Sequence, residues 1–480
     1  MYTFLAGIAL LVIAYFTYGK FVEKVFGVKE KRPTPAYANA DGVDYVPMKK
    51  GSNSLIQLLN IAGVGPIFGP IMGALYGPVA FIWIVIGCIF AGAVHDYLTG
   101  MISIRNRGAH LPELAGKFLG KAMKHVVNLF AILLLVLTAT VFVTAPAGLL
   151  HTLMNGWVSL GVITAAIFGY YFLATMLPID KIIGKLYPYF GALLIISAFG
   201  VGAMLIITGA DIPELSLTNM HPDNLPIFPL LFLTITCGAL SGFHATQTPI
   251  ISRTTQNEKQ GRYIFYGMMI AEGIIAMIWA AAAMSLYDGQ GLNAVLTDGG
   301  GTGAVVSEVS TALLGAIGGT LAVLGVIVLP ITSGDTAFRS ARMIIADYLN
   351  ISQKAIANRL WIALPLFAIS IALTFIDFNI LWRYFSWANQ STAAIALWVG
   401  AMYLFIASKN YWIALIPAVF ITYTTFTYIL NAQIGFQLPM DISYFVAGIM
   451  TAVCIAAFFV GGKKLRKGNL PLDEEVPMAA

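Results

Sequence analysis

Long apolar runs separated by short polar loops follow one another along the whole chain. About 20 helical residues cross a ~30 Å hydrocarbon core, and runs of that length recur from one end to the other. The pattern predicts an all-α integral membrane protein with about 13 transmembrane spans. The spans are expected near residues 2–19, 54–75, 79–104, 124–150, 157–177, 186–208, 227–252, 262–286, 311–333, 357–376, 383–405, 410–430 and 441–461.

The basic residues test this count, because Lys and Arg near span ends stay on the cytoplasmic side. Of the 27 Lys and Arg residues, 26 fall in alternate loops or the tail, and only Arg383 falls on the other side. These segments are 20–50, 105–124, 181–185, 253–262, 339–359, position 409 and 463–467. We therefore expect the N-terminus outside a bacterial inner membrane and the tail, 463–480, in the cytoplasm.

Composition excludes several classes of function. Only 10% of the residues are charged, against roughly 25% in soluble domains. The net charge of +5 comes from residues scattered among loops, so nucleic acid is not an expected partner. No catalytic set or nucleotide motif appears, which predicts a protein that is not an enzyme. The cysteines, Cys88, Cys237 and Cys454, lie in apolar runs without metal-ligand spacing and are interpreted as buried hydrophobes.

Two spans are interrupted by glycine and proline, at Asn60–Pro70 (NIAGVGPIFGP) and at Cys237–Pro249 (CGALSGFHATQTP). In hydrocarbon such breaks persist only where protein or water satisfies the freed backbone groups. The breaks are five spans apart and enter from opposite sides, which predicts two inverted five-helix repeats, 54–208 and 227–405, with a site between them. The alternative is that the glycines only permit close helix packing.

This organisation divides the chain into an N-terminal helix and basic loop (1–50), a core (51–405), two further helices (406–462) and the tail. Amides exposed at half-helix N-termini favour a negatively charged group, so a carboxylate is the expected substrate group. The candidate substrate-binding residues are Asn60, Gly63, Gly65, Gly69, Ser241, Gly242 and His244.

Ionisable side chains inside a membrane are costly, so each needs a reason. Asp96 and Glu272 lie within predicted spans and are candidates for proton coupling, since desolvation suits a buried carboxyl to take up and release a proton. The alternative is a buried carboxyl held by a neighbouring donor. Thr332 and Ser333 offer adjacent hydroxyls for a sodium ion. Asp335, which follows them, has the i, i+4 spacing of a helix ion pair with Arg339 and could be only a gate or anchor.

Several motifs together resemble the carbon starvation protein family, CstA. They are DGVDYVP (Asp41–Pro47), AGVGPIFGP (Ala62–Pro70), AGAVHDY (Ala91–Tyr97), CGALSGFHA (Cys237–Ala245), Glu272 after YGMM, and DTAFRSAR (Asp335–Arg342). The chain departs from the longer members at Leu58, Leu59 and Asn60, where they have paired histidines, and in the loop Pro178–Pro188. No role attached to those histidines is carried over.

The resemblance implies a LeuT-like fold of the amino acid, polyamine and organocation superfamily. It also implies uptake of short peptides or pyruvate during carbon starvation, coupled to protons or sodium. The chain is therefore expected to be a secondary transporter in contact with a small-molecule substrate and the lipid bilayer. A membrane-embedded metabolite sensor without net transport is the alternative. The short tail argues against it, because it offers no signalling domain. No cofactor is expected beyond a sodium ion, and the sequence leaves substrate, coupling ion and oligomeric state open.

Overall fold

The computed structural model describes residues 1–42, 44–176, 179–298 and 300–474. Three sequence features fall partly outside them: Val43 of the first family motif, the junction of the predicted span 157–177 with Pro178, and tail residues 475–480. The first helices are α1 Tyr2–Phe16, α2 Tyr18–Phe26, α3 Pro35–Ala38, α4 Lys50–Ile61, α5 Gly65–Gly73, η1 Ala74–Tyr76, α6 Val79–Gly87, η2 Cys88–Gly92, α7 Ala93–Arg105, α8 Leu111–Leu119 and α9 Lys121–Leu153.

The helices that follow are α10 Leu160–Met176, α11 Ile179–Ile207, α12 Ile227–Thr234, α13 Gly242–Ser252, η3 Glu258–Gln260, η4 Arg262–Tyr266, α14 Gly267–Leu286, α15 Gly289–Thr297, α16 Gly301–Leu349, α17 Ile356–Leu373, α18 Phe378–Ile406, α19 Trp412–Asn431 and α20 Met440–Lys467. The described residues thus form an all-helical fold, with one isolated backbone bridge between Met48 and Thr255.

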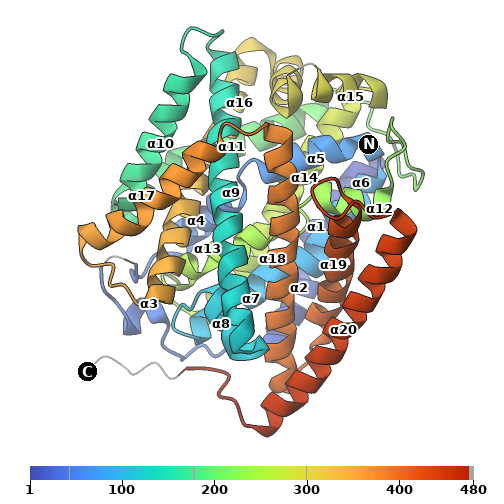
Figure 1. The fold of residues 1–480 in the computed structure, drawn as a ribbon. Helices are drawn as coiled ribbons and strands as arrows, with labels where there is room; N and C mark the ends of the chain where they lie inside the picture. The colour runs from blue at the N-terminus through green and yellow to red at the C-terminus, as the bar shows by residue number, and fades with distance from the viewer. Residues whose placement is uncertain (43, 177–178, 299, 475–480) are drawn as a thin grey trace.

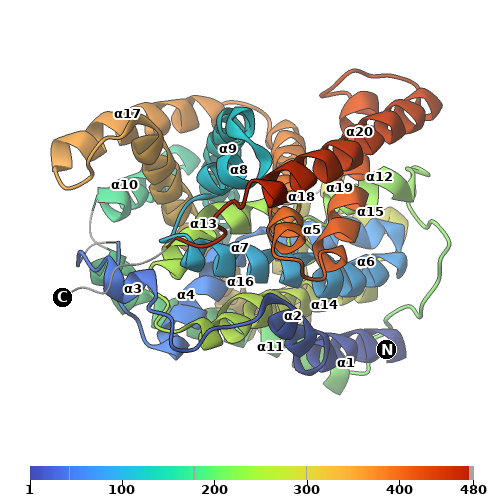
Figure 2. The same cartoon turned by 90° about the horizontal axis from the view of Figure 1, so that it is seen from below.

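Long helices run between two ends of the molecule, with the N-terminus at one end and the C-terminal tail at the other (Figure 1). Helix α20 lies at the periphery in both views (Figures 1 and 2) and exposes large apolar side chains such as Phe445 and Val460. Exposed apolar side chains along a long outer helix are typical of a lipid-facing surface. The helix carries no charge between Asp441 and Lys463.

Nine helices among the described residues are long and apolar enough to cross a membrane, and the bent pair α4 and α5 would make ten. Two shorter apolar helices cover Leu160–Met176 and Gly191–Ile207. Helix α16 is 49 residues long but has non-helical backbone at Gly315, so its first turns form a separate segment. The structure therefore establishes a multi-span helical fold, while the number of 13 spans stays a prediction.

Basic loops that are far apart in sequence meet at one end of the molecule. Arg105 at the end of α7 donates to both carboxylate oxygens of Glu258, at 3.0 and 2.9 Å, and to the Tyr403 hydroxyl at 3.0 Å. The tail reaches the same cluster, because Asp473 pairs with Arg32 at 2.7 Å and accepts from Tyr403 at 2.8 Å. The predicted alternation of loops is consistent with this shared basic end.

The N-terminus and the loops with few basic residues lie at the opposite end of the molecule. The Met1 ammonium lies 2.7 Å from a Glu214 carboxylate oxygen, and the Thr3 hydroxyl also donates to Glu214. These hydrogen bonds lower the pKa of Glu214 to about 2, because they stabilise its charged form. Arg383, the one basic residue off the pattern, contacts Gln433. Which end faces the cytoplasm stays a prediction from the charge bias.

The buried Arg105–Glu258 pair makes a testable contribution to stability. Replacing Glu258 with Gln leaves the Arg105 charge, 2% exposed, without its anionic partner, which costs about 3–5 kcal/mol in comparable pairs. We expect a lower thermal midpoint in detergent. The adjacent Lys259→Gln is the matched control, because its pair with Glu30 is exposed on both sides and such pairs contribute roughly 0–1 kcal/mol. Equal midpoints for the two variants would contradict this ranking.

Candidate functional site

The first predicted break lies at residues 62–64, between α4 and α5, whose axes differ by 45°. The interruption predicted within Asn60–Pro70 is thus present and occupies three residues. Pro66 occupies the first turn of α5, where its missing N–H costs no hydrogen bond, so it starts a helix rather than ending one. Gly65 and Gly69 are accordingly helical.

The second break covers residues 235–241, between α12 and α13. Gly238 has a φ of +86°, a conformation that side chains with a Cβ rarely adopt. Ser241 is extended and precedes α13, which contains both Gly242 and His244 in its first turn and Pro249 further on. The interruption predicted within Cys237–Pro249 is thus present, it begins at Ile235, and the segment from Gly242 to Pro249 is helical.

The two broken helices lie against each other and run in opposite directions. Near the start of α4, the Met48 amide donates to the Thr254 carbonyl just beyond the end of α13. Midway, the Asn60 amide group approaches Gln247 at 3.4 Å. At the far end, a Cβ built on Gly69 would lie 2.9 Å from the Thr234 carbonyl oxygen. The breaks thus meet in one place.

Glycines on α5 make that close approach possible. A Cβ on Gly65 would overlap the side chain of Cys237, and one on Gly73 would overlap Ile235. Gly63, within the break, faces the ring of Phe142 just as closely. The packing role that the sequence left as an alternative is thus present together with the break itself.

Helix α18 closes the N-terminus of α13. The Asn389 side-chain oxygen accepts from the Phe243 amide at 2.7 Å and from the Ser241 hydroxyl at 3.2 Å. Gly242 packs directly on the α18 backbone at Asn389 and Ala393. The Gly238 amide in the break donates to a Glu272 oxygen at 3.1 Å. Protein groups therefore already accept hydrogen bonds from the Phe243 and Gly238 amides. The sequence had predicted that amides in this segment bind a substrate carboxylate.

A buried amide and hydroxyl layer joins α4, α13 and α16. Thr336 donates to the Asn60 side-chain oxygen at 2.9 Å, and Gln247 donates to Gln57 at 3.3 Å. The Ser333 and Thr332 hydroxyls both donate to the Leu59 carbonyl, at 3.0 and 3.2 Å. Thr332 and Ser333 of α16, the predicted sodium ligands, therefore contact the end of α4 beside the first break. Their binding of sodium stays a prediction.

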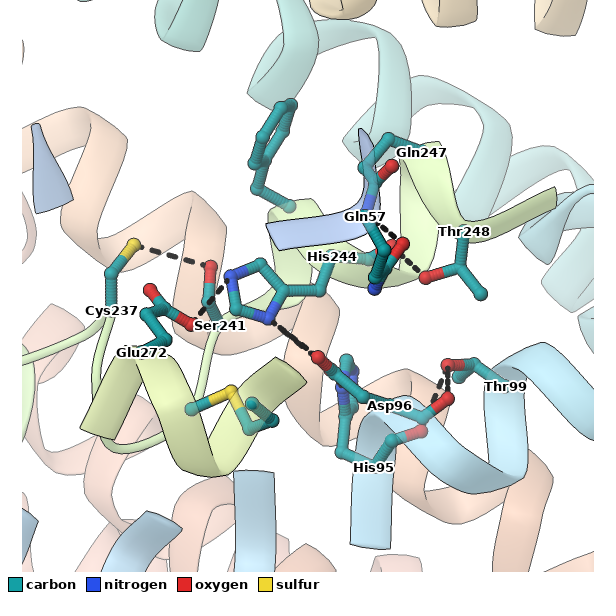
Figure 3. A network of polar contacts seen from close by, with 12 residues as sticks. Gln57, His95, Asp96, Thr99, Cys237, Ser241, His244, Gln247, Thr248 and Glu272 are labelled. Carbon is teal, nitrogen blue, oxygen red and sulfur yellow. Dashed lines mark hydrogen bonds and ion pairs between the residues drawn. The ribbon is translucent and has the colours of Figure 1, made fainter. Parts of the chain in front are cut away.

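A cluster of titratable side chains lies beside the second break (Figure 3). His244 Nδ1 is 2.9 Å from Asp96 Oδ2, and His95 Nδ1 is 2.8 Å from Asp96 Oδ1. His244 Nε2 faces Glu272 Oε2 at 3.5 Å. The side chains of all four residues are fully buried. Helices α7, α13 and α14 thus bring both predicted carboxyls to one histidine, while their role in proton coupling stays a prediction.

Six polar side chains of the site were missing from the sequence prediction: Gln57, His95, Cys237, Gln247, Thr336 and Asn389. Cys237 was interpreted as a buried hydrophobe, yet its thiol donates to Ser241 at 3.4 Å and its sulfur lies near His244 and Glu272. Gln57, Gln247 and Asn389 are polar residues within apolar spans, which was the available signal. The sequence alone does not indicate which residues these side chains contact, because their partners come from distant segments.

The fold and site define a polytopic helical membrane protein with a buried polar site between two discontinuous helices. The sequence pattern of the carbon starvation protein CstA matches residues 1–167, 157–313 and 294–428. The chain belongs to the CstA family. This finding confirms the resemblance inferred from the motifs.

Individual relatives differ in how much of the chain they match. An uncharacterized membrane protein of Haemophilus influenzae is 49% identical over 58% of this chain and 90% of its own length. The peptide transporter CstA of Escherichia coli is 26% identical over 88% of this chain and 79% of its own. The pyruvate/proton symporter BtsT of Escherichia coli is 27% identical over 59% of this chain, and the match spans 49% of that protein.

Among solved structures, a manganese transporter of Eremococcus coleocola is similar in fold. The TM-score is 0.57 at 13% identity, over 89% of this chain and 99% of the other. At that identity the likeness concerns the arrangement of helices alone. The fold is thus one that solved membrane transporters use.

The close contact at Gly69 gives a prediction about the site's architecture. The added methyl group of Gly69→Ala would lie 2.9 Å from the Thr234 backbone oxygen. A backbone atom cannot move aside as the end of a flexible side chain can. Overpacking of this kind costs about 1–3 kcal/mol, so we expect a lower thermal midpoint in detergent. Gly148→Ala in α9 is the control, because its methyl meets no atom within 4 Å and alanine favours a helix. Tolerance of Gly69→Ala would contradict the described packing.

Proposed function

We propose that this chain is a secondary transporter that imports a small carboxylate-bearing nutrient, a short peptide or pyruvate, during carbon limitation. The proposed location is the bacterial inner membrane, with the basic end in the cytoplasm. A proton or sodium gradient drives the uptake, and no enzymatic step is part of the proposal. The observation that carries it is the meeting of two oppositely directed, broken helices at a buried polar site.

The antiparallel contact supports a LeuT-like arrangement of two inverted five-helix repeats. In such transporters, a pseudo-two-fold axis in the membrane plane relates the halves, and discontinuous helices from each half form the site. Helices α4 and α5 belong to the first proposed repeat, and α12 and α13 to the second. The names of two relatives, a peptide transporter and a pyruvate/proton symporter, support the substrate class.

We place the substrate carboxylate at the N-terminus of α5. Asn389 already accepts from the Phe243 amide at the start of α13, so α5 is the better of the two half-helix ends for an anion. The helix dipole favours negative charge there. Pro66 has no N–H, and the Ile67 and Phe68 amides already donate to the Val64 carbonyl, so the dipole carries this placement. Asn60, Gly63 and Gly65 then line the carboxylate end of the substrate.

Uptake into proteoliposomes tests the proposal. The purified protein is given labelled pyruvate or a labelled dipeptide, with an imposed proton gradient, an imposed sodium gradient, or neither. Accumulation above the equilibrium level under one gradient, abolished by an ionophore for that ion, supports transport and identifies solute and ion. Absence of uptake of both solutes under both gradients, by protein that elutes as a single folded species, would contradict the proposal.

A separate test of sodium coupling uses the hydroxyls beside the first break. Thr332→Val removes an oxygen that lies next to the Leu59 carbonyl while keeping the side chain's shape. If sodium drives uptake, we expect roughly tenfold more sodium to be needed for half-maximal rate, equivalent to about 1.4 kcal/mol. Thr320→Val on the same helix is the control, because its exposed hydroxyl bonds only its own helix backbone. An unchanged sodium dependence in Thr332→Val would remove Thr332 from the site.

A further inference from the structure

Three side chains of different chemical type converge beside the second break. One ligand atom each of Cys237, His244 and Glu272 lies within 4.8 Å of the other two, and all three residues are buried. They come from the broken segment, from the first turn of α13 and from the second turn of α14. Figure 3 shows the three side chains directed toward one another.

The hydrogen bonds around this group orient its lone pairs inward. Asp96 Oδ2 lies 2.9 Å from His244 Nδ1 and, as a carboxylate, accepts there, so Nδ1 carries a proton. In the neutral form of that imidazole, Nε2 presents a lone pair. Glu272 uses Oε1 to accept from the Gly238 amide at 3.1 Å. His244 Nε2 and Glu272 Oε2, both fully buried, have no hydrogen-bond partner among the described residues. With a neutral His244 and an ionised Glu272, two acceptors face each other, and a proton or a metal ion between them satisfies both.

The spacing suits a metal ion. His244 Nε2 and Glu272 Oε2 are 3.5 Å apart. Zinc bonds of about 2.0–2.1 Å to nitrogen and about 2.0–2.2 Å to oxygen place tetrahedral ligands roughly 3.4 Å apart. The Cys237 sulfur lies within 4.8 Å of both atoms, and a zinc–sulfur bond of about 2.3 Å requires it to move toward them.

The surrounding residues have the arrangement that metal-binding histidines normally have. A carboxylate on the second ring nitrogen fixes the tautomer and makes the imidazole a better ligand. Asp96 takes that position on His244 and is itself held by His95 at 2.8 Å. The carboxylates of Asp96 and Glu272, with a Cys237 thiolate, also provide negative charge that a divalent cation would neutralise.

We propose that Cys237, His244 and Glu272 bind a divalent transition-metal ion of the zinc class, with Asp96 positioning His244. A thiolate, an imidazole and a carboxylate select such a borderline cation over Mg²⁺ or Ca²⁺, which prefer oxygen ligands alone. On binding, the Cys237 thiol loses its proton to solvent and the sulfur donates its electron pair to the metal. Three protein ligands leave a fourth position open.

Cobalt titration of the purified full chain in detergent tests this site, and it requires no knowledge of the transported solute. Chelator-treated protein is titrated with Co²⁺, followed by displacement with Zn²⁺ and measurement of bound metal per chain. We expect one Co²⁺ per chain, with a sulfur-to-cobalt charge-transfer band that Zn²⁺ removes. Absence of stoichiometric binding to folded wild-type protein overturns the proposal.

Variants assign the ligands. Cys237→Ser should lose the charge-transfer band, whereas Cys88→Ser should keep it, because the buried Cys88 thiol donates to the Met269 carbonyl instead. Asp96→Asn should keep the band and weaken affinity on the order of 10- to 100-fold. Persistence of the band in Cys237→Ser overturns the assignment. Each variant is compared as a folded species, by elution volume and thermal midpoint, and Cys237→Ala serves if Cys237→Ser does not fold.

Discussion

A helix broken inside a membrane leaves backbone amides and carbonyls that hydrocarbon cannot satisfy, so protein must pair them. This constraint organises the centre of the molecule. The two breaks lie together. Asn389 accepts a hydrogen bond from the Phe243 amide, and Glu272 accepts one from the Gly238 amide. Hydroxyls of α16 donate to the Leu59 carbonyl. Each partner comes from a different helix. The helices around the breaks are thus held by the polar groups that the breaks expose.

Helix α13 connects this centre to the basic end. Its first turn carries His244, and beyond its last turn Arg253 donates to the Gly108 carbonyl at 2.9 Å and lies 3.6 Å from Asp347. On the proposed function, α13 is the element that connects the binding site to the basic end.

Much of the fold was accessible from sequence because hydrocarbon imposes simple rules. Run length predicted the helices, and glycine with proline marked both breaks. In the first segment only residues 62–64 are unwound, because Pro66 falls in a first helical turn, where proline is favourable. Among the site residues, Asp96, His244 and Glu272 were found because a buried charge in a membrane is conspicuous.

The remaining site residues depend on contacts between distant segments. Asn389 is separated from Phe243 by 146 residues, and nothing near either position in the sequence indicates their hydrogen bond. Cys237 resembles a small hydrophobe in isolation and becomes a candidate ligand only beside Glu272, which comes from another helix. Such pairings follow from how helices pack, and a single sequence does not encode that packing in any local pattern.

The central claim is that the solute binds where the two breaks meet. The most direct measurement is an experimental structure of the protein with its transported solute bound. We expect solute density between Ala62–Val64 and the start of α13, with the solute carboxylate at the N-terminus of α5. Density confined to another cavity, with the two breaks closed on each other as described, would contradict it.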